Sequence, residues 1–347
     1  MQSTRQTKSD ALVVIIMPVY NEARHLPDVL ASLDRQAFPR ERMFLVVVDG
    51  NSNDGSSALV REWLATSDIA GCVVDNPRRK IPVALNLALQ HADDTDIVMR
   101  LDAHTIYSDT YVADAVRSLE NAPADVACIG SAQLPVPGTT FEERVVEALY
   151  TNPLGLGGAD FRLGDDVREV DSVYLGVWRP GILSRCLGFN ESMDANEDGE
   201  LAARLRSMGF RLLRVPLECR FLIKRGVLAS IRQWNRYGYF RAKMLQRHPQ
   251  FIRLRHVAAP AAVLFLGCLL MSPLRLMVLP LFMLYACALF RLRKNREPFA
   301  VTLATLAFFP LVQLSFAAGM FGGLLTGRGS DWPPTDIRPA RSTQSAP

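Results

Sequence analysis

The sequence predicts an α/β domain followed by a basic segment and apolar helices. Apolar, strand-like runs alternate with helical patterns over residues 11–215, which is typical of a parallel sheet covered by helices. Residues 1–218 contain 21 basic and 32 acidic residues, whereas residues 219–296 contain 15 basic residues and no acidic residue. The chain therefore changes its environment near residue 219.

Each predicted strand is a short apolar run that ends at polar or glycine-rich residues. Continuous apolar runs suit strands that are buried on both faces, and the helices between them carry apolar residues three or four positions apart. Ser108 or Asp109 is the expected cap of the fourth helix. We predict strands over residues 11–17, 43–48, 72–75, 96–101, 126–131, 170–177 and 210–215, and helices from residue 23 to about 36, over 56–66, 81–91, 107–119, near 140–150 and over 197–208.

The N-terminal part of the chain is expected in the cytoplasm. The six cysteines include no Cys-x-x-Cys pair and no metal-ligand spacing, which favours a reducing compartment. Only seven apolar residues precede Pro18, so they read as a strand and not as a signal peptide. Four histidines are expected to face solvent, namely His25, His91, His248 and His256.

Acidic residues follow two of the predicted strands. Asp49 and Asp54 come after the second strand, and Asp102 and His104 come after the fourth. Ligands of open parallel sheets bind beyond the carboxyl ends of the strands. No Gly-x-Gly-x-x-Gly follows the first strand, which argues against a nicotinamide dehydrogenase, and there is no P-loop. A nucleoside diphosphate beside these acids needs a divalent cation, and a histidine ligand favours Mn²⁺ without excluding Mg²⁺.

Five motifs make the pattern more specific. They are Pro-Val-Tyr-Asn-Glu at 18–22, Val-Asp-Gly-Asn-Ser-Asn-Asp-Gly-Ser at 48–56, Arg-Leu-Asp-Ala-His at 100–104, Asn-Glu-Asp-Gly-Glu-Leu at 196–201 and Gln-Trp-Asn-Arg-Tyr at 233–237. Their order and spacing resemble family 2 glycosyltransferases with the GT-A fold, a Rossmann-like fold of nucleotide-diphospho-sugar transferases. The resemblance covers about residues 12–240 and is greatest to succinoglycan-type exopolysaccharide glucosyltransferases, although Tyr237 replaces the tryptophan of the Gln-x-x-Arg-Trp motif.

The resemblance implies a site for a UDP-sugar donor. Pro18, Tyr20 and Glu22 would line the nucleotide pocket, and Asp49 would hydrogen-bond the uracil ring. Asn86 occupies a position where the family often has a donor-site asparagine. Two simpler interpretations stay open: Asp49 caps the helix that follows it, and Asn86 is an ordinary asparagine on a helix surface.

The resemblance also implies a metal and a general base. Asp102 and His104 would hold the cation on the diphosphate, with His104 in place of the last aspartate of the family's common Asp-x-Asp motif. Asp198 would take the proton of the acceptor hydroxyl in a single displacement with inversion. The alternative is that Asp198 is a first-turn acid favoured by the helix dipole.

The remaining polar residues of the motifs have less definite roles. Glu197, Gln233 and Arg236 are candidates for contacts with the acceptor or the diphosphate. Glu197 also fits a first-turn acid. Three structural alternatives concern neighbouring charges: Asp54 caps a helix, Glu200 pairs with Arg204 at i,i+4, and Arg100 pairs with a core carboxylate.

The C-terminal third predicts membrane attachment. Three apolar segments cover residues 257–270, 276–290 and 299–325, and only the third is clearly long enough to span a bilayer core of about 30 Å. The first two are short, which suits a tight hairpin or an embedded re-entrant pair. The basic residues at 291–296 place their loop in the cytoplasm. Basic and aromatic residues at 226–256 suit an interfacial helix on anionic lipid better than a nucleic-acid site. We expect a GT-A domain over 1–225, an interfacial segment over 226–256, two or three membrane helices over 257–325 and a polar tail over 326–347.

Together these expectations describe an enzyme of the inner (cytoplasmic) membrane that passes through it more than once. It would transfer a hexose, with glucose favoured, from a UDP-sugar to a polyprenyl-diphosphate-linked saccharide, alongside membrane lipids and other polysaccharide-assembly proteins and without nucleic acid. The alternatives are transfer to a polyprenyl phosphate, processive polysaccharide synthesis, and a non-catalytic membrane scaffold.

Overall fold

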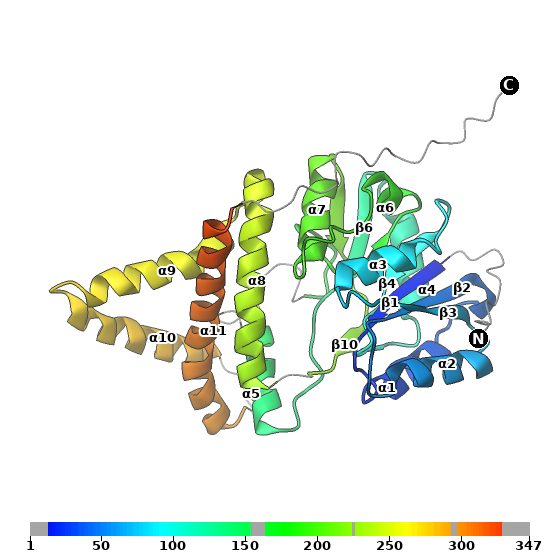
Figure 1. Ribbon diagram of the computed structural model, residues 1–347. Coiled ribbons are helices and arrows are strands. Elements are labelled where there is room, and N and C mark those ends of the chain that lie inside the picture. The colour runs from blue at the N-terminus through cyan, green and yellow to red at the C-terminus, as the bar shows by residue number, and fades with distance from the viewer. Residues whose placement is uncertain (1–12, 153, 155–163, 224–225, 293–296, 328–347) are drawn as a thin grey trace. The chain divides into compact units, whose positions relative to one another are not determined.

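The computed structural model describes residues 13–152, 154, 164–223, 226–292 and 297–327 (Figure 1). The chain divides into two compact units. Among the described residues, the first unit contains 13–132 and 165–220, and the second contains the others. Residues 11–12, most of the basic run at 291–296 and the tail from 328 lie outside the described residues. The predicted division at 225 and 256 stays a prediction.

An eight-stranded sheet forms the centre of the first unit, in the order β3-β2-β1-β4-β8-β6-β9-β7. The first four strands of this order run parallel, with Val19 of β1 opposite Asp49 of β2. Their carboxyl ends therefore meet at one edge, as predicted. The strands are β1 Val13–Val19, β2 Met43–Asp49, β3 Ala70–Asp75, β4 Ile97–Arg100, β6 Val126–Ser131, β7 Arg168–Val170, β8 Tyr174–Trp178 and β9 Arg211–Arg214.

The prediction of a wholly parallel sheet is wrong. β8 runs antiparallel to both β4 and β6, and β7 runs antiparallel to β9. Residues 170–177, predicted as one strand, are broken at 171–173 into the end of β7 and the start of β8. An apolar run buried on both faces has the same pattern in either strand direction, so the sequence could not distinguish them.

Helices follow most of the strands of the first unit. The predicted helix over 107–119 begins later, because residues 105–107 form the short strand β5 (Thr105–Tyr107). Its N-cap is Thr110, and no side chain caps it, so the capping role of Ser108 or Asp109 is wrong. The helices are α1 Leu26–Asp34, α2 Ser56–Thr66, α3 Ile81–Leu89, α4 Tyr111–Asn121, α6 Ile182–Arg185 and α7 Glu197–Ser207; β10 spans Cys219–Phe221 and a 3₁₀ turn spans Arg40–Arg42.

The core of this unit explains why the strand ends are fixed. Six of the seven residues of β1 and all seven of β2 are buried. Burial of apolar area contributes roughly 25 cal/mol per Å², so a shift of one residue in either strand is costly. The register of the strands therefore fixes where the polar residues just beyond their carboxyl ends lie along the edge of the sheet.

The second unit is mainly helical. Its helices are α5 Phe141–Thr151, α8 Val227–Arg247, α9 Leu254–Leu270, α10 Val278–Leu292 and α11 Phe299–Leu325, with 3₁₀ turns at Pro249–Phe251 and Arg275–Met277. Thr140 and Glu143 form a capping box at the start of α5. By length and composition two segments could cross a membrane, Arg275–Leu292 and Phe299–Leu325, while the 17 residues of α9 fall short.

Candidate active site

The loops after β1 and β2 are bound to each other. Asn21, with a positive φ of 53°, donates from its backbone to Ser52 Oγ, and its side-chain oxygen accepts from the Asn53 backbone at 3.0 Å. Asp54 accepts from the Ala23 backbone at 2.9 Å. Hydrogen bonds to backbone on both sides lock two segments that lie about 30 residues apart in the sequence. The two motifs therefore form one rigid rim.

Asp49 lies at the end of β2 under this rim and is 4% exposed. Its Oδ2 accepts from the Ser52 backbone at 3.1 Å, whereas Oδ1 is buried with no hydrogen-bond partner. Because Ser52 precedes α2, which begins at Ser56, this hydrogen bond does not cap the helix, and the alternative that Asp49 is a helix cap is wrong. Asp54 accepts from the backbone and hydroxyl of Ser56 at the start of α2, as predicted for a capping acid. A buried acceptor without a partner is unfavourable, which makes Asp49 a candidate for binding a ligand N–H.

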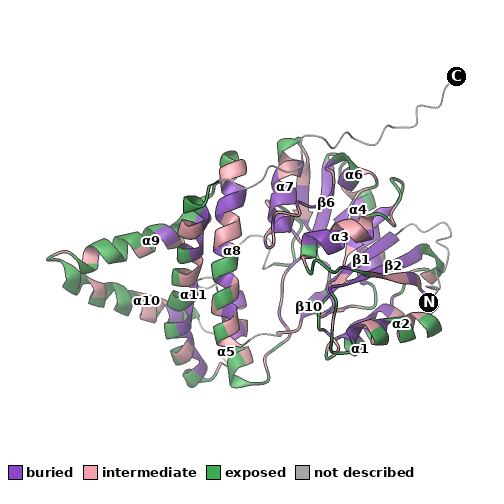
Figure 2. Cartoon of the chain, viewed as in Figure 1, coloured by how far each residue is buried: buried purple, intermediate pink, exposed green. Residues whose placement is uncertain are grey.

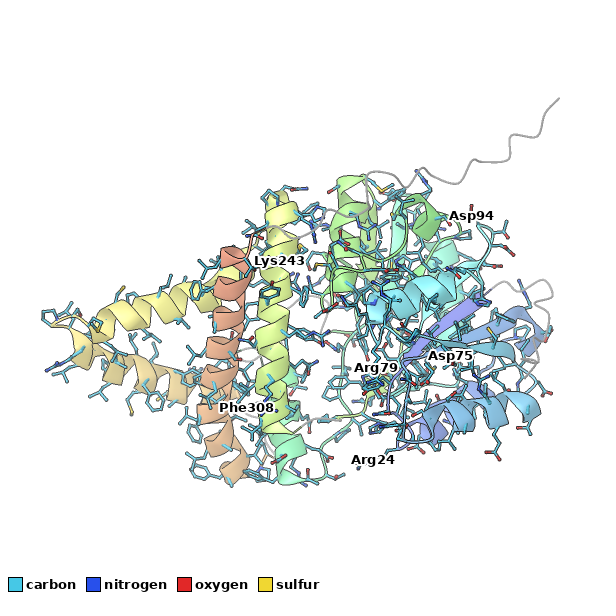
Figure 3. The ribbon with its side chains drawn as sticks, in the orientation of Figure 1. Arg24, Asp75, Arg79, Asp94, Lys243 and Phe308 are labelled. Carbon is cyan, nitrogen blue, oxygen red and sulfur yellow. The ribbon has the colours of Figure 1, made fainter. Side chains whose placement is uncertain are left out.

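Tyr20 follows β1 and is exposed next to the rim, whereas Pro18 lies within β1. Tyr20 is 50% exposed, and the guanidinium of Arg79 lies 5.7 Å from the centre of its ring. Pro18 is half-buried near the end of β1. Figure 3 labels Arg79 and, at the end of β3, Asp75. An aromatic ring and a cation at a strand end are suited to a nucleotide, and the nucleotide contacts of Tyr20 and Pro18 stay a prediction.

Glu22 is held between two histidines. Its Oε2 lies 3.1 Å from His25 Nδ1, and its Oε1 lies 3.6 Å from His104 Nδ1. The carboxylate side chain is only 5% exposed. His25 therefore does not simply face solvent, contrary to the prediction, and neither does His256, which is buried in the second unit. Glu22 contacts the side chain that was predicted to bind metal.

The backbone of Asp102 is held by the Tyr107 hydroxyl through both its N–H and its carbonyl group. The Tyr107 hydroxyl accepts from the Asp102 backbone N–H at 2.8 Å and lies 3.1 Å from its carbonyl oxygen, to which it donates. Burial, together with the charge of Asp102, raises the pKa of Tyr107 well above its ordinary value, so the phenol stays protonated. The contact of Tyr107 with Asp102 was not predicted, and the only available signal was their separation of five positions in the sequence.

Arg100 connects two parts of the site that are far apart in the sequence. Its Nε donates to Asp102 Oδ1 at 3.1 Å, and its Nη1 donates to Glu197 Oε1 at 3.0 Å. Burial by itself lowers the pKa of Arg100, but the charges of Asp102, Glu197 and Asp198 raise it above its ordinary value. The alternative that Arg100 pairs with core carboxylates is thus confirmed. We call Asp102, Glu197 and Asp198 around Arg100 the carboxylate cluster.

The cluster contains acids of different character. Burial raises the pKa of Glu197 against the opposing effect of Arg100, and the charge of Asp198 adds to the rise. Asp198 is half-buried at the start of α7, where its Oδ1 accepts from the Gly199 backbone at 2.7 Å. Both acids lie in the first turn of the helix, where its dipole favours negative charge. Glu197 and Asp198 are therefore both first-turn acids of α7 and members of the carboxylate cluster, and the first position does not exclude the second.

Glu200 has a purely structural environment. It accepts from Arg204 Nε at 3.0 and 3.1 Å, which confirms the predicted i,i+4 pair. Arg204 also donates to the carbonyls of Cys186 and Gly188, so this pair attaches α7 to the preceding turn.

Asn86 is not a surface residue. Its amide donates to the Phe189 carbonyl at 2.8 Å and to Glu191 at 3.1 Å, and its oxygen accepts from the Phe189 backbone. It also lines a cavity of about 250 Å³ together with Val98 of β4 and Asp96, which precedes this strand. The helix-surface interpretation is wrong, and a donor contact by Asn86 stays a prediction.

Gln233 and Arg236 lie on α8 in the second unit. Gln233 Nε2 donates to the Tyr237 hydroxyl at 2.7 Å, one helical turn away. The predicted contact of these residues with acceptor or diphosphate therefore stays a prediction.

A basic loop that was not predicted to belong to the site follows β3. Arg78 lies 2.6 Å from Glu191, and Lys80 lies 2.8 Å from Asp194. These ion pairs attach the loop to the segment that precedes α7. Three consecutive basic residues, which begin three positions after the end of β3, were the available signal.

Asp102 and His104 are the pair that could hold a divalent cation. In the part of the chain that the structure describes, no three His, Cys, Asp or Glu side chains are grouped as a metal site. A cation with two protein ligands completes its coordination with phosphate oxygens and water. The Glu22 carboxylate beside His104 Nδ1 is the usual outer partner of a metal-binding histidine. The residues fit a cation shared between protein and diphosphate.

Comparisons with known proteins agree with this arrangement. Residues 14–148 match the model of glycosyl transferase family 2. Succinoglycan biosynthesis protein ExoA of Rhizobium meliloti (strain 1021) is 29% identical over 336 residues, which are 94% of this chain and 99% of the relative. The dolichyl N-acetyl-alpha-D-glucosaminyl phosphate 3-beta-D-2,3-diacetamido-2,3-dideoxy-beta-D-glucuronosyltransferase of Methanococcus voltae is 20% identical over 324 residues, which are 92% of this chain and 98% of the relative.

A solved structure supports the fold. Mannosyltransferase PcManGT from Pyrobaculum calidifontis, in complex with GDP-Man and Mn²⁺, has a TM-score of 0.61 and 21% identity, over 91% of this chain and 88% of that chain. With the mixed sheet, the strand-end acids and the family match, this identifies the chain as a glycosyltransferase whose residues 14–148 match family 2 and whose α/β unit has the GT-A fold.

Proposed function

We propose that the protein transfers a hexose, with glucose favoured, from a UDP-sugar to a polyprenyl-diphosphate-linked saccharide in exopolysaccharide or cell-envelope glycan biosynthesis. The observation that carries the proposal is the carboxylate cluster, in which Arg100 joins the strand-end Asp102 to Glu197 at the start of α7. The similarity to a succinoglycan biosynthesis protein over nearly the whole chain supports the biosynthetic role.

The donor would bind at the rim formed by the loops after β1 and β2. Asp49 Oδ1 offers a buried acceptor to a ring N–H of uracil. Tyr20 offers an exposed aromatic face, and Pro18 completes the strand end beside it. Glu22 would act through His104 and not by touching the nucleotide, because its carboxylate already lies between two histidines.

Asp198 would serve as the general base. It would accept the proton of the acceptor hydroxyl while that oxygen forms a bond to the anomeric carbon. The bond from this carbon to the diphosphate oxygen breaks in the same step, UDP leaves, and the configuration is inverted. Glu197 is buried and occupied by Arg100, so it would position the cluster and not take the proton.

A divalent cation, Mn²⁺ or Mg²⁺, would be held by Asp102 and His104. When bound, it would neutralise charge on the departing diphosphate. The mannosyltransferase PcManGT contains Mn²⁺ with its nucleotide sugar, which supports the same requirement here.

The acceptor would be presented at the inner membrane, with the GT-A unit in the cytoplasm. The apolar segments of the second unit support attachment, and α8 carries Gln233 and Arg236 as candidate acceptor contacts. The Methanococcus voltae relative, named for a dolichyl-phosphate-linked sugar, supports a lipid-linked acceptor.

Transfer to a polyprenyl phosphate and processive synthesis are the alternative reactions. The test is a panel of UDP-sugars given to membranes that contain the protein, with lipid extracts and Mn²⁺, and products identified by mass spectrometry. We expect release of UDP and a lipid-linked saccharide longer by one hexose. A polyprenyl monophosphate sugar or a long polymer would favour the alternatives, and no UDP release from any donor would contradict the proposal.

The family match and the similar transferases argue against the third alternative, a non-catalytic scaffold. It predicts that the protein does not bind UDP with Mn²⁺ in a calorimeter, whereas the transferase predicts binding.

A further inference from the structure

The helices α9 and α10 expose apolar side chains on every face. Residues 264–268 and 279–284 are exposed in succession, which covers more than a full helical turn in each helix (Figure 2). In Figure 3 side chains project from both sides of both ribbons. The large exposed residues include Leu264, Phe265, Leu270, Met271, Leu274, Leu276, Leu279, Phe282, Met283 and Leu284. Among the described residues, none covers the segments 264–268 and 279–284 of this hairpin, so lipid is the solvent that fits them.

The helix α11 differs because only one stripe of it is exposed. Phe299, Leu303, Leu311, Leu314 and Leu325 follow a helical repeat and are each 48–86% exposed. The residues between them, including Thr305, Phe309, Val312 and Met320, are buried against the rest of the unit. Although α11 is long enough to cross a bilayer at about 40 Å, only one of its faces is open to lipid.

The covered face of α11 lies against α8 (Figure 1). Ser315 donates to the Ile231 carbonyl, and Lys243 donates to the Gly327 carbonyl, with the same separation of 84 residues in both pairs. Since the separation is constant along the pair, α8 and α11 run parallel with a fixed register. A Cβ at Gly319 would overlap the Asn235 carbonyl oxygen, so the two backbones are in close contact at this position. Separating the helices would lose this packing.

The helix α8 is too polar for the bilayer core. It contains five basic residues and no acidic residue over 21 positions, and Arg232 and Arg236 are exposed. Arg and Lys near the centre of a bilayer are strongly unfavourable. Residues 315–327, at the C-terminal part of α11 and just beyond it, are bound to residues 231–243 of α8 over about three turns. Since this contact includes Arg232 and Arg236, α11 cannot cross the membrane without taking these charges toward the core.

We propose that the α9–α10 hairpin enters the bilayer, and that α11 lies along the membrane surface together with α8. The exposed stripe of α11 would face the acyl chains, and the basic residues of α8 would face anionic headgroups. This inference rests on the membrane attachment proposed above, and it replaces the expectation that residues 299–325 span the membrane.

Depth measurement by electron paramagnetic resonance tests the arrangement. Nitroxides are attached to single cysteines, in a full-length chain whose six native cysteines are replaced, in vesicles of phosphatidylcholine and phosphatidylglycerol. Labels at Leu303→Cys, Leu311→Cys and Leu325→Cys report on α11, and Leu264→Cys reports on the hairpin. Glu62→Cys, exposed on α2, is the aqueous reference. Oxygen and nickel-chelate accessibility give each depth.

We expect the three α11 labels at one shallow depth and the hairpin label deeper. A deep Leu311 label between two shallow ends would overturn the proposal, because that profile belongs to a spanning helix. A membrane-impermeant maleimide gives a second measurement at Ser345→Cys in the tail. It should label this site from the same side as Glu62→Cys, and labelling from the opposite side would overturn the proposal. If the hairpin label also reports water, membrane attachment itself has failed.

Discussion

Glu22 restrains His104 through a carboxylate contact at 3.6 Å, which makes His104 the most specific residue to test for metal binding. We expect His104→Ala to lower Mn²⁺ affinity and activity together, because one of two protein ligands is lost. His104→Asp should keep much of both, since a carboxylate also binds the cation. Calorimetric Mn²⁺ titration in the presence of UDP measures this. Equal activity of wild type and His104→Ala at every Mn²⁺ concentration would remove His104 from the metal site.

Glu22 itself should act as a positioning residue. Glu22→Gln keeps the side-chain shape but removes the charge beside His104 Nδ1, and we expect Mn²⁺ affinity to fall about 10-fold or more. His25→Ala is the matched control, because it removes the other partner of Glu22 and leaves the contact with His104. An unchanged Mn²⁺ affinity in Glu22→Gln would assign Glu22 a structural role only.

The sequence could predict which acids gather at the strand ends, and it could not predict how they are connected. Asp49 and Asp102 lie at or just after the ends of buried strands, so their position at the carboxyl edge of the sheet was predictable from the apolar runs. The position of Glu22 between two histidines depends on loop packing over about 80 residues of sequence, which no local pattern reports. For the same reason the link from Arg100 to Glu197 could be stated only as an alternative.

At the scale of elements, the close approach of α8 and α11 gives a direct stability test. Gly319→Ala places a methyl group on the Asn235 carbonyl, and we expect it to destabilise the second unit by about 1–3 kcal/mol. Gly267→Ala on α9 is the control, because its Cβ would meet nothing within 4 Å. That change should be neutral or stabilising by up to about 1 kcal/mol. Thermal unfolding in detergent measures both, and equal midpoints would contradict the close packing.

The capping box of α5 gives a prediction with a pH dependence. Hydrogen bonds from the Thr139 hydroxyl and from the backbone of Thr140 and Thr139 lower the pKa of Glu143 to about 2 from its ordinary 4.5. A depressed carboxylate stabilises the folded state above its unfolded pKa, and this contribution is lost as the pH falls from 4.5 toward 2. Thr140→Ala should cost about 1 kcal/mol at neutral pH. Glu143→Gln should lower the midpoint at pH 7 more than at pH 3, and an equal loss at both would contradict the assignment.

Elements with a single strong pattern were predictable, and elements that depend on partners were not. The strand β6 and the helix α2 have the predicted bounds, because each is a continuous run with clear polar ends. The direction of β8 and the short strand β5 depend on the strands beside them. The contact of α8 with α11 joins segments 84 residues apart, and the apolar composition of α11 alone suggested a membrane span.

At the scale of the whole molecule, charge and chemistry are divided along the chain. The acidic N-terminal part contains the carboxylate cluster, and the basic part, which begins at residue 219, contains α8 and the helices that follow it. The proposed function would use this division, because one enzyme would take a soluble donor at its acidic part and a membrane acceptor near its basic part. The net charge alone, which is +4, conceals the division.

The most direct test of the account is the Asp198→Asn enzyme with the UDP-sugar and lipid acceptor found in the donor panel. We expect the rate of transfer to fall by about 10²–10⁴-fold with unchanged UDP binding, because only the proton acceptor is lost. Asp194→Asn, four residues earlier and paired with Lys80, should keep most of the activity. Full activity of Asp198→Asn would contradict the proposed general base and with it the assigned mechanism.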